Sequence, residues 1–446
     1  MYEEVIKFID DNLSNSLDDL KKLVRIPTVA AKGEGIEETS KLVENMLQGA
    51  GLETQVHPTT GAPVVTGWWN VGAKRTLLFY DHYDVQPAEP LELWDSSPFE
   101  PEIRDGRLWG RGVADNKGDT TSRISVIKAF KETGTELPVN IKFVIEGEEE
   151  IGSLHLPEYI EKNTEFITAD GGIWEFGGAG VDGVQEAWLG LKGIFFVELE
   201  VERLSRNLHS SLACTLPSAA YRLIWALNSF RDEDSRILID GFYDNIKPLT
   251  EAELKAIEKI DLHEEEYKEI YAIDEYLNGL SGLALKRAYY GDPTCNICGI
   301  ASGYQGKGSM TVLPAKASVK IDFRLVEGMH PDDIHRKLRN HLDKHGFDDI
   351  KVTYFEGYPA AKTPIDHPFV KIVEAANKRI FGDLIIHPTS PGSGPLYLFN
   401  KYVPMVSIGC GDHLGRAHSP NESISLENYH KAQHRIVAIM DEMSHW

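Results

Sequence analysis

Two short apolar runs with a helical segment between them constrain the fold more than any other feature of the sequence. Thr76–Tyr80 and Val139–Ile145 are compact and apolar, as strands buried on both faces are. Between them, apolar residues recur at helical spacing from Thr120 to Lys131. This order predicts an α/β fold, with a mixed and mostly parallel sheet flanked by helices.

The pattern changes at about residue 190. Ile194–Val201 and Ala317–Leu325 alternate apolar with polar residues, as strands with one solvated face do. After about residue 358 the strand–helix alternation returns. We therefore predict an α/β domain in two segments, 1–189 and 358–446, interrupted by an α+β domain at 190–357. Further helices are expected at 5–24, 37–51, 219–230, 251–271, 331–345, 369–381 and 426–443, and a strand at 403–408.

Composition excludes several classes of protein. The 446 residues carry a formal charge of −23, and a chain this acidic would repel nucleic acid. Four cysteines are too few for a disulfide framework in a chain this long. The N-terminal residues do not resemble a signal peptide, and no apolar run is long enough to span a membrane. We therefore expect a cytoplasmic protein with neither a nucleic-acid nor a membrane partner.

The first group of potential metal ligands directly follows the strand at 76–80. His82 and Asp84 are two residues apart, so an extended backbone places both on one face. This arrangement suits a metal-binding imidazole that is held by a neighbouring carboxylate. Taken alone, the same residues are equally typical of a polar turn.

Carboxylates supply two further groups. Asp115 lies in a glycine-rich loop that opens a helix, where it could bridge two cations or simply cap the helix. Glu148, Glu149 and Glu150 follow the strand at 139–145, and adjacent glutamates are costly unless a cation compensates them. One of them can bind a metal while its neighbour acts as a base, although a solvated acidic turn is the plainer alternative. Asp170 is another carboxylate after a short apolar run.

The fourth group follows the strand at 403–408 and offers His413 and His418. Two imidazoles with several carboxylates suit zinc, manganese or cobalt and are a poor set for calcium.

Together these ordered motifs resemble the co-catalytic di-metal aminoacylase/carboxypeptidase family over nearly the whole chain. The family includes carnosinase-type dipeptidases, glutamate carboxypeptidase and succinyl-diaminopimelate desuccinylase, and it has a di-zinc exopeptidase-like fold. The cytosolic dipeptidase branch is the most similar, because of Gly241–Asp244 with the charged helix after it, and Ala417–Glu422.

The resemblance implies two divalent metal ions per chain, Zn²⁺ first and Mn²⁺ or Co²⁺ as alternatives. It implies that Asp84 orients His82, that Glu149 is the general base and that Glu148 is a bystander. The metal ligands that it implies are His82, Asp115 and Asp170 for one ion, and Asp115, Glu150 and His418 for the other.

The resemblance also implies that the inserted domain is a lid that forms a homodimer. His209 would polarise the substrate carbonyl, often from the partner subunit, and Arg324 would bind the substrate carboxylate. Thr311, Gly392 and Ser393 fall where the family lines its substrate pocket. An ordinary loop position for His209 and a structural ion pair for Arg324 are the alternatives.

Three residues depart from the family pattern. Asp81 replaces the usual Gly or Asn before the first histidine, and Asn207 and Ser211 replace an Asp and a Gly around His209. None of these positions is an expected metal ligand, so the departures concern the orientation of His209 and substrate preference.

The expected function is metal-dependent hydrolysis of the amide bond of dipeptides or short peptides with a free C-terminal carboxylate. Two metals and Glu149 would activate a bridging water. An N-acyl-amino-acid deacylase with the same metal site is the main alternative. A metal-free binding protein and a serine hydrolase are less favoured, because the ligand set is complete and Pro391–Pro395 lacks a nucleophile elbow. Cys295 and Cys298 form a lone CxxC, which we assign to packing.

Overall fold

The computed structural model describes residues 2–446, which form two compact units. Within the described residues, the first unit is made of 2–190, Lys362–Thr389 and Gly394–Trp446. The second unit is made of Leu191–Ala361 and Ser390–Ser393. The insertion expected at 190–357 has nearly the borders of the second unit. Two short strands, β10 (Gly190–Leu191) and β17 (Ala361–Lys362), lie where the chain passes between the units.

A ten-stranded sheet is the base of the first unit. Its strands in spatial order are β1 (Glu53–His57), β2 (Val64–Trp69), β6 (Asn140–Glu146), β3 (Thr76–His82), β7 (Gly171–Trp174), β19 (Met405–Ser407), β9 (Gln185–Trp188), β8 (Gly178–Ala179) and β20 (Gly411–Asp412), with β18 (Leu384–His387) paired to β9. Neighbouring strands in the series β6, β3, β7 and β19 are parallel to each other. Strand β2 is antiparallel to both of its neighbours, β1 and β6. The predicted fold class, a mixed sheet flanked by helices, is confirmed.

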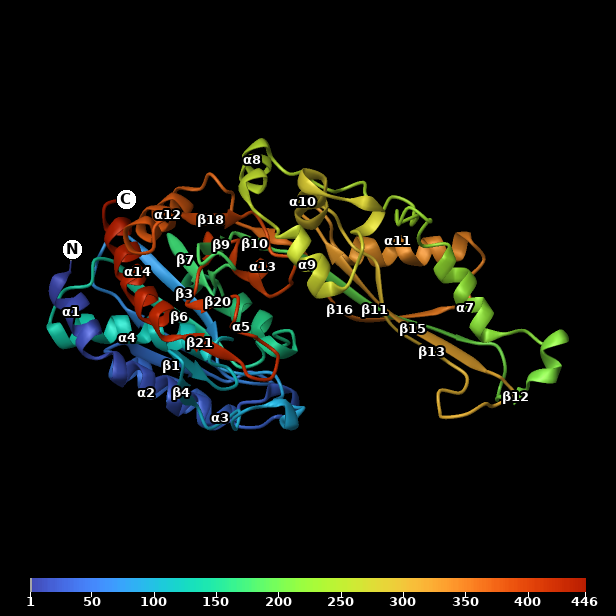
Figure 1. Cartoon of the computed structure of the whole chain (residues 1–446), viewed down its shortest axis with the longest axis horizontal. Helices are drawn as coiled ribbons and strands as arrows, with labels where there is room; N and C mark the ends of the chain where they lie inside the picture. The colour runs from blue at the N-terminus through green and yellow to red at the C-terminus, as the bar shows by residue number, and fades with distance from the viewer. Residues whose placement is uncertain (1) are drawn as a thin grey trace. The chain divides into compact units, whose positions relative to one another are not determined.

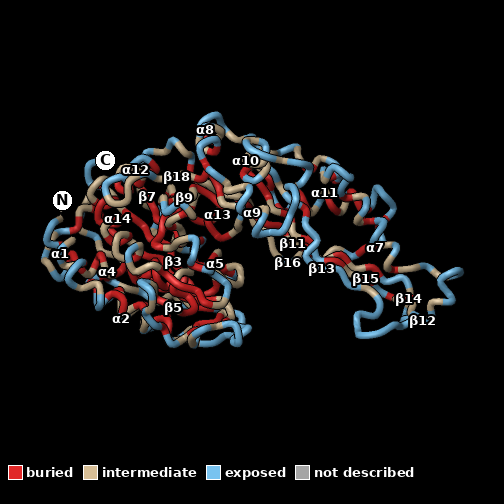
Figure 2. The backbone as a smooth tube through the Cα atoms, viewed as in Figure 1, coloured by how far each residue is buried: buried red, intermediate tan, exposed pale blue. Residues whose placement is uncertain are grey.

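Helices cover this sheet. They are α1 (Glu3–Asp11), α2 (Leu13–Val24), α3 (Ile36–Gly49), α4 (Lys117–Thr133), α5 (Leu156–Lys162), α6 (Thr164–Ile167), α12 (Pro368–Ile380), α13 (Leu396–Phe399) and α14 (Leu426–Ser444). Helices α1, α4 and α14 contact one another, and α3 packs on β1 and β2 (Figure 1). The central strands are buried on both faces (Figure 2), as the apolar runs in the sequence predict. A small sheet of β4 (Glu102–Arg104), β5 (Arg107–Trp109) and β21 (Ser423–Ser425) completes the unit.

The second unit has an antiparallel four-stranded sheet in the order β13 (Asn296–Ser302), β15 (Lys316–Leu325), β11 (Gly193–Glu202) and β16 (Lys351–Tyr358). Buried and solvated side chains alternate along β11 and β15, as predicted. The other strands and helices are β12 (Leu208–His209), β14 (Val312–Leu313), α7 (Ala219–Asn228), α8 (Glu251–Lys259), α9 (Glu264–Tyr271), α10 (Gly282–Gly291) and α11 (Pro331–Lys344).

Two predicted helices are each divided in the structure. The segment 5–24 breaks at Asn12, whose side-chain amide donates to the Phe8 carbonyl and ends α1. The segment 251–271 breaks between α8 and α9, where the Asp261 side chain accepts from the His263 amide in a local turn. Apolar periodicity continues across the first break, so the sequence pattern alone did not reveal it. No helix within residues 2–446 combines the length and the apolar character that a membrane span requires.

Candidate metal centre and substrate-binding residues

The potential ligands of the first unit meet where parallel strands end. In the parallel register of β3 and β6, His82 lies beside Glu146, and the Glu148–Glu150 turn follows directly. Strand β7 runs parallel to β3 on its other side and is followed at once by Glu175. Because carboxyl ends of parallel strands share one edge of a sheet, these side chains converge.

His82 is the innermost imidazole of this group and is fully buried. Its Nε2 lies 3.0 Å from Asp115 Oδ1 and 3.5 Å from Glu175 Oε2. Its Nδ1 lies 3.1 Å from the Asp84 carbonyl oxygen. Burial by itself lowers the pKa of His82, yet the hydrogen bonds with Asp115 and Asp84 and the charge of Glu175 raise it well above its usual value. The imidazole therefore lies in a strongly negative environment, which is where a cation binds favourably.

Asp84 connects His82 to the glutamate turn. Its Oδ1 accepts from the Glu149 amide at 3.2 Å, and its Oδ2 accepts from the Glu150 amide at 3.1 Å. The same Oδ1 lies 3.4 Å from His82 Nδ1. One buried carboxylate thus contacts both the imidazole and the turn that carries the two glutamates.

The loop that carries Asp115 is held by Glu422, for which the sequence predicted no separate role. Glu422 is fully buried, and its Oε1 accepts from the amides of Ala114 and Asp115 at 2.8 and 3.1 Å. Its Oε2 accepts from the Gly112 amide and from Arg111 Nη1. Burial would raise the pKa of Asp115, but hydrogen bonds with His418 and His82 hold it below its usual value. Glu422 therefore shapes the loop that presents Asp115.

A second group of donors surrounds His418. Its Nε2 lies 3.0 Å from Asp115 Oδ2 and 3.0 Å from Glu150 Oε2. Single donor atoms of these three residues all lie within 4.8 Å of one another, as a metal ion requires. Hydrogen bonds with Asp115 and then Glu150 raise the pKa of His418 to about 10. Asp115 thus faces His82 with one oxygen and His418 with the other.

Glu149 stands beside both groups at the start of a 3₁₀ turn, Glu149–Ile151. Burial raises its pKa well above the usual value, and the charges of Glu150 and Asp115 raise it further, against the effect of His82. A carboxyl group whose pKa is raised holds a proton more readily, which suits a general base. Glu148 points elsewhere, because its carboxylate accepts from the Ala62 amide and contacts His155.

Asp170 is not part of this cluster, and its expected role as a ligand needs correction. Its carboxylate binds Arg75 Nη1 at 2.8 Å and the Thr76 amide at 2.9 Å, at the beginning of β3. His82 ends the same strand, about 20 Å away at ~3.3 Å per residue. Asp170 precedes β7, whereas the carboxylate next to His82 is Glu175, which follows it. The rule that ligands follow strands would have selected Glu175.

These side chains fit divalent metal ions. Glu175 Oε2 is buried and has no hydrogen-bond partner among residues 2–446, which leaves it available for a cation. Imidazole nitrogens and carboxylate oxygens together form the mixed donor set that zinc, manganese and cobalt accept. Carboxylates packed this closely also repel one another unless positive charge compensates them.

Three of the expected substrate-binding residues lie together in the second unit, namely Arg324, Gly392 and Ser393. Arg324 Nη1 donates to Ser393 Oγ at 2.7 Å, and Ser393 Oγ donates to the Gly193 carbonyl. Arg324 Nε lies 3.7 Å from Asp322, and the arginine side chain is 35% exposed. Gly392 is in the same short segment, and its carbonyl accepts from the Lys192 amide.

His209 and Thr311 form a separate pair at the β12–β14 ladder. Thr311 Oγ1 lies 3.3 Å from His209 Nε2, and His209 Nδ1 lies 2.9 Å from Ser211 Oγ. His209 is exposed, and Asn207 accepts from the Ala315 amide at 2.9 Å. The two departures from the family pattern here thus make local hydrogen bonds, and Ser211 directly contacts the imidazole.

The third departure, Asp81, has a structural reason. Its Oδ1 accepts from Arg123 Nη1 at 2.7 Å, and both side chains are buried. The same guanidinium donates to the carbonyls of Tyr80 on β3 and Trp174 on β7. Asp81 therefore supplies the countercharge for an arginine that connects the two strands at the ends that carry His82 and Glu175.

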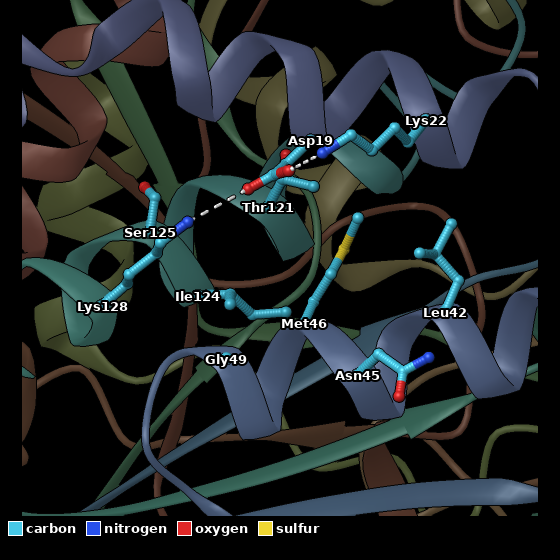
Figure 3. A pocket seen from close by; sticks show the side chains of 10 residues that line it. All are labelled: Asp19, Lys22, Leu42, Asn45, Met46, Gly49, Thr121, Ile124, Ser125 and Lys128. Carbon is cyan, nitrogen blue, oxygen red and sulfur yellow. Dashed lines mark hydrogen bonds and ion pairs between the residues drawn. The ribbon is translucent and has the colours of Figure 1, made fainter.

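Two other features of the sequence and structure carry no catalytic chemistry. A cavity of about 190 Å³ lies between α2, α3 and α4 (Figure 3), where Asp19 pairs with Lys22 at 2.7 Å and with Lys128 at 3.7 Å. The cysteines of the lone CxxC are both free, with Cys295 buried and Cys298 exposed.

The fold and the clustered ligands define a metal-dependent hydrolase. The family model for peptidase family M20/M25/M40 matches residues 78–442. The chain therefore belongs to this family and is a metallopeptidase.

Three relatives illustrate the similarity. The M20 family metallo-carboxypeptidase Sso-CP2 from Sulfolobus solfataricus is 36% identical, with a TM-score of 0.91 over 97% of this chain and 99% of that one. Cys-Gly metallodipeptidase DUG1 of Saccharomyces cerevisiae is 32% identical over 80% of this chain and 77% of its own length. Beta-Ala-His dipeptidase of Mus musculus is 29% identical over 83% of this chain and 77% of its own length.

The assignment of Glu175 can be tested against that of Asp170 with two matched substitutions. Glu175→Gln removes a donor from the His82 group, so we expect metal affinity at one position to fall ~10–100-fold or more. Asp170→Asn alters only the contacts with Arg75 and the Thr76 amide at the opposite end of β3, so we expect the metal content to stay unchanged. Metal analysis after dialysis measures both, and loss of metal from Asp170→Asn alone would contradict the assignment.

Proposed function

We propose that the protein hydrolyses the amide bond of dipeptides or short peptides that carry a free C-terminal carboxylate. The observation that carries this proposal is the pair of histidine–carboxylate groups that share Asp115, with Glu149 beside both. Family membership supports the peptidase activity.

Two divalent cations, Zn²⁺ foremost and Mn²⁺ or Co²⁺ as alternatives, fit the cluster. His82, Asp115 and Glu175 would hold one ion, and Asp115, Glu150 and His418 would hold the other. When bound, such ions supply Lewis acidity, which lowers the pKa of water and stabilises negative charge on an amide oxygen.

Glu149 is the residue that moves the proton. Its carboxylate takes a proton from the attacking water and delivers it to the amine that leaves. The backbone amide of Glu149 is held by Asp84, so the base and the ligand Glu150 keep a fixed spacing. The site therefore separates the tasks of adjacent glutamates, one for the proton and one for the metal.

Arg324 is the proposed recognition group for the substrate carboxylate. A guanidinium presents a planar fork of donors that matches a carboxylate, and Ser393 occupies only one of them in the structure. Its partial exposure leaves the other donors accessible to a ligand. Gly392 and Ser393 lie beside Arg324 in this proposed substrate-binding set, whereas Thr311 lies beside His209 and would act together with it.

The dipeptidase assignment is favoured over the deacylase alternative by the relatives. The curated relatives named above are, by their names, dipeptidases of Beta-Ala-His and Cys-Gly. A free carboxylate is common to peptides and acyl amino acids, so Arg324 by itself serves both reactions.

His209 is proposed to polarise the substrate carbonyl from the partner subunit. Within the second unit, His209 adjoins the segment that leads into Lys316, and Arg324 lies near the other end of β15. Lys316 and Arg324 are separated by about 26 Å at ~3.3 Å per residue. A dipeptide spans only about 7 Å. One small substrate therefore cannot contact both residues of one chain.

Exposed apolar surface in the second unit supports a homodimer. Tyr221, Ile224 and Trp225 are 60, 49 and 59% exposed and share one face of α7. Strand β13 is an edge strand whose Ile297 and Ile300 are also exposed. An apolar helix face and an open strand edge in the same unit are each suited to pairing with a second copy about a twofold axis.

The role of Glu149 is tested by comparing it with its neighbour. Glu149→Gln keeps the size of the side chain but removes the base, so we expect dipeptide turnover to fall ~10²–10⁴-fold while the metal content is unchanged. Glu148→Gln is the matched control, because Glu148 faces Ala62 and His155, and it should retain most of the turnover. Wild-type rates from Glu149→Gln would refute the assignment.

The contribution of His209 across subunits is tested by mixing two inactive variants. His209→Ala has an intact base, and Glu149→Gln has an intact His209. If the imidazole acts across the dimer, random reassembly should restore about a quarter of the wild-type turnover, since about half of the dimers are mixed and each has one competent site. Failure of the mixture to recover turnover, with mixed dimers verified by mass, would show that His209 acts within its own chain.

A further inference from the structure

A second group of possible metal ligands lies outside the catalytic cluster. Asp10 on α1 faces His430 and His434 on α14, and these two helices contact each other. His430 Nε2 lies 2.7 Å from Asp10 Oδ1, and His434 Nε2 lies 2.8 Å from the same oxygen. Single donor atoms of all three residues lie within 4.8 Å of one another.

The local structure fixes this arrangement. Residues four apart on a helix are neighbours on one face, so α14 presents both imidazoles together, with ring centroids 4.7 Å apart. Val5 and Ile9 anchor α1 in the core of the first unit, which places Asp10 beside the two rings. The cluster therefore depends on two well-packed helices and on no flexible loop.

Hydrogen bonding alone gives an incomplete account of this cluster. Two imidazole nitrogens are directed at one carboxylate oxygen, and within residues 2–446 no lysine or arginine pairs with Asp10. The two imidazoles thus converge on a negative charge that no lysine or arginine of the described residues compensates, and a divalent cation between the three side chains would supply that compensation.

We propose that Asp10, His430 and His434 bind one divalent cation of the zinc class, which ties α1 to α14. Two imidazoles and one carboxylate, completed by water, match a three-ligand zinc site. Imidazole donors disfavour magnesium and calcium, which prefer oxygen ligands. The side chains are 19–45% exposed, so an ion can enter from solvent.

This site is separate from the catalytic cluster and serves a different purpose. It shares no residue with the group of Asp115, Glu150 and His418. A bound ion would connect a helix at the beginning of the chain with the helix at its end, and thus stabilise the first unit. Binding at this site does not depend on the identity of the substrate. We therefore expect the protein to bind one more metal ion per chain than the catalytic site holds.

Metal counting tests the proposal. Wild-type protein and the double variant His430→Asn/His434→Asn are stripped with chelator, reloaded with Zn²⁺, dialysed and analysed for bound zinc. We expect the double variant to bind one ion fewer per chain and to keep wild-type dipeptide turnover. His345→Asn is the matched control, because His341 and His345 form another pair four residues apart, with ring centroids 4.3 Å apart, outside the proposed site. It should bind as much zinc as the wild type.

A second variant keeps the test decisive if the double variant fails to fold. Asp10→Asn changes one partly exposed side chain, and it should also bind one zinc ion fewer. Zinc counts equal to those of the wild type in both variants, or in Asp10→Asn alone if only that variant folds, would overturn the proposal. A lower count accompanied by loss of turnover would also overturn it, because the missing ion would then belong to the catalytic cluster.

Discussion

Parallel pairing of β3 with β6 and β7 is the constraint on which the rest of the site depends. The register sets His82 beside Glu146 and leaves the residues after β6 and β7 at the same edge of the sheet. Arg123 reinforces this edge by donating to the carbonyls of Tyr80 and Trp174. If either strand slipped by one residue, its side chains would turn to the other face, and the ligands would no longer converge.

The convergence brings together negative charges that destabilise one another. Desolvation and neighbouring carboxylates raise the pKa values of Glu149 and Glu175 well above their usual range. The protein stabilises the arrangement through hydrogen bonds from backbone amides, which Asp84 and Glu422 accept on either side of the cluster. Divalent cations would supply the remaining positive charge. Metal binding and the tuning of the base are therefore parts of one electrostatic arrangement.

The fold class followed from local sequence patterns, since apolar runs mark buried strands. The polar groups after those strands marked candidate site residues, and the family resemblance supplied the roles predicted for them. Asp170 was assigned through the family resemblance, and β7 is a four-residue strand with two glycines whose apolar pattern is too short to show that Glu175 follows it. The role of Glu422 was not predictable, because it contacts Gly112 across 310 residues of sequence. Long-range contacts of this kind leave no periodicity in the sequence.

Turnover measured before and after metal removal shows whether hydrolysis depends on the metal centre. The purified protein is assayed with dipeptides, their C-terminal amides and N-acyl amino acids, as isolated, after chelation, and after zinc, manganese or cobalt is returned. We expect dipeptides with a free carboxylate to be hydrolysed fastest. Chelation should abolish turnover, and a divalent metal should restore it. Undiminished dipeptide turnover in verified metal-free protein, or turnover of acyl amino acids alone, would contradict it.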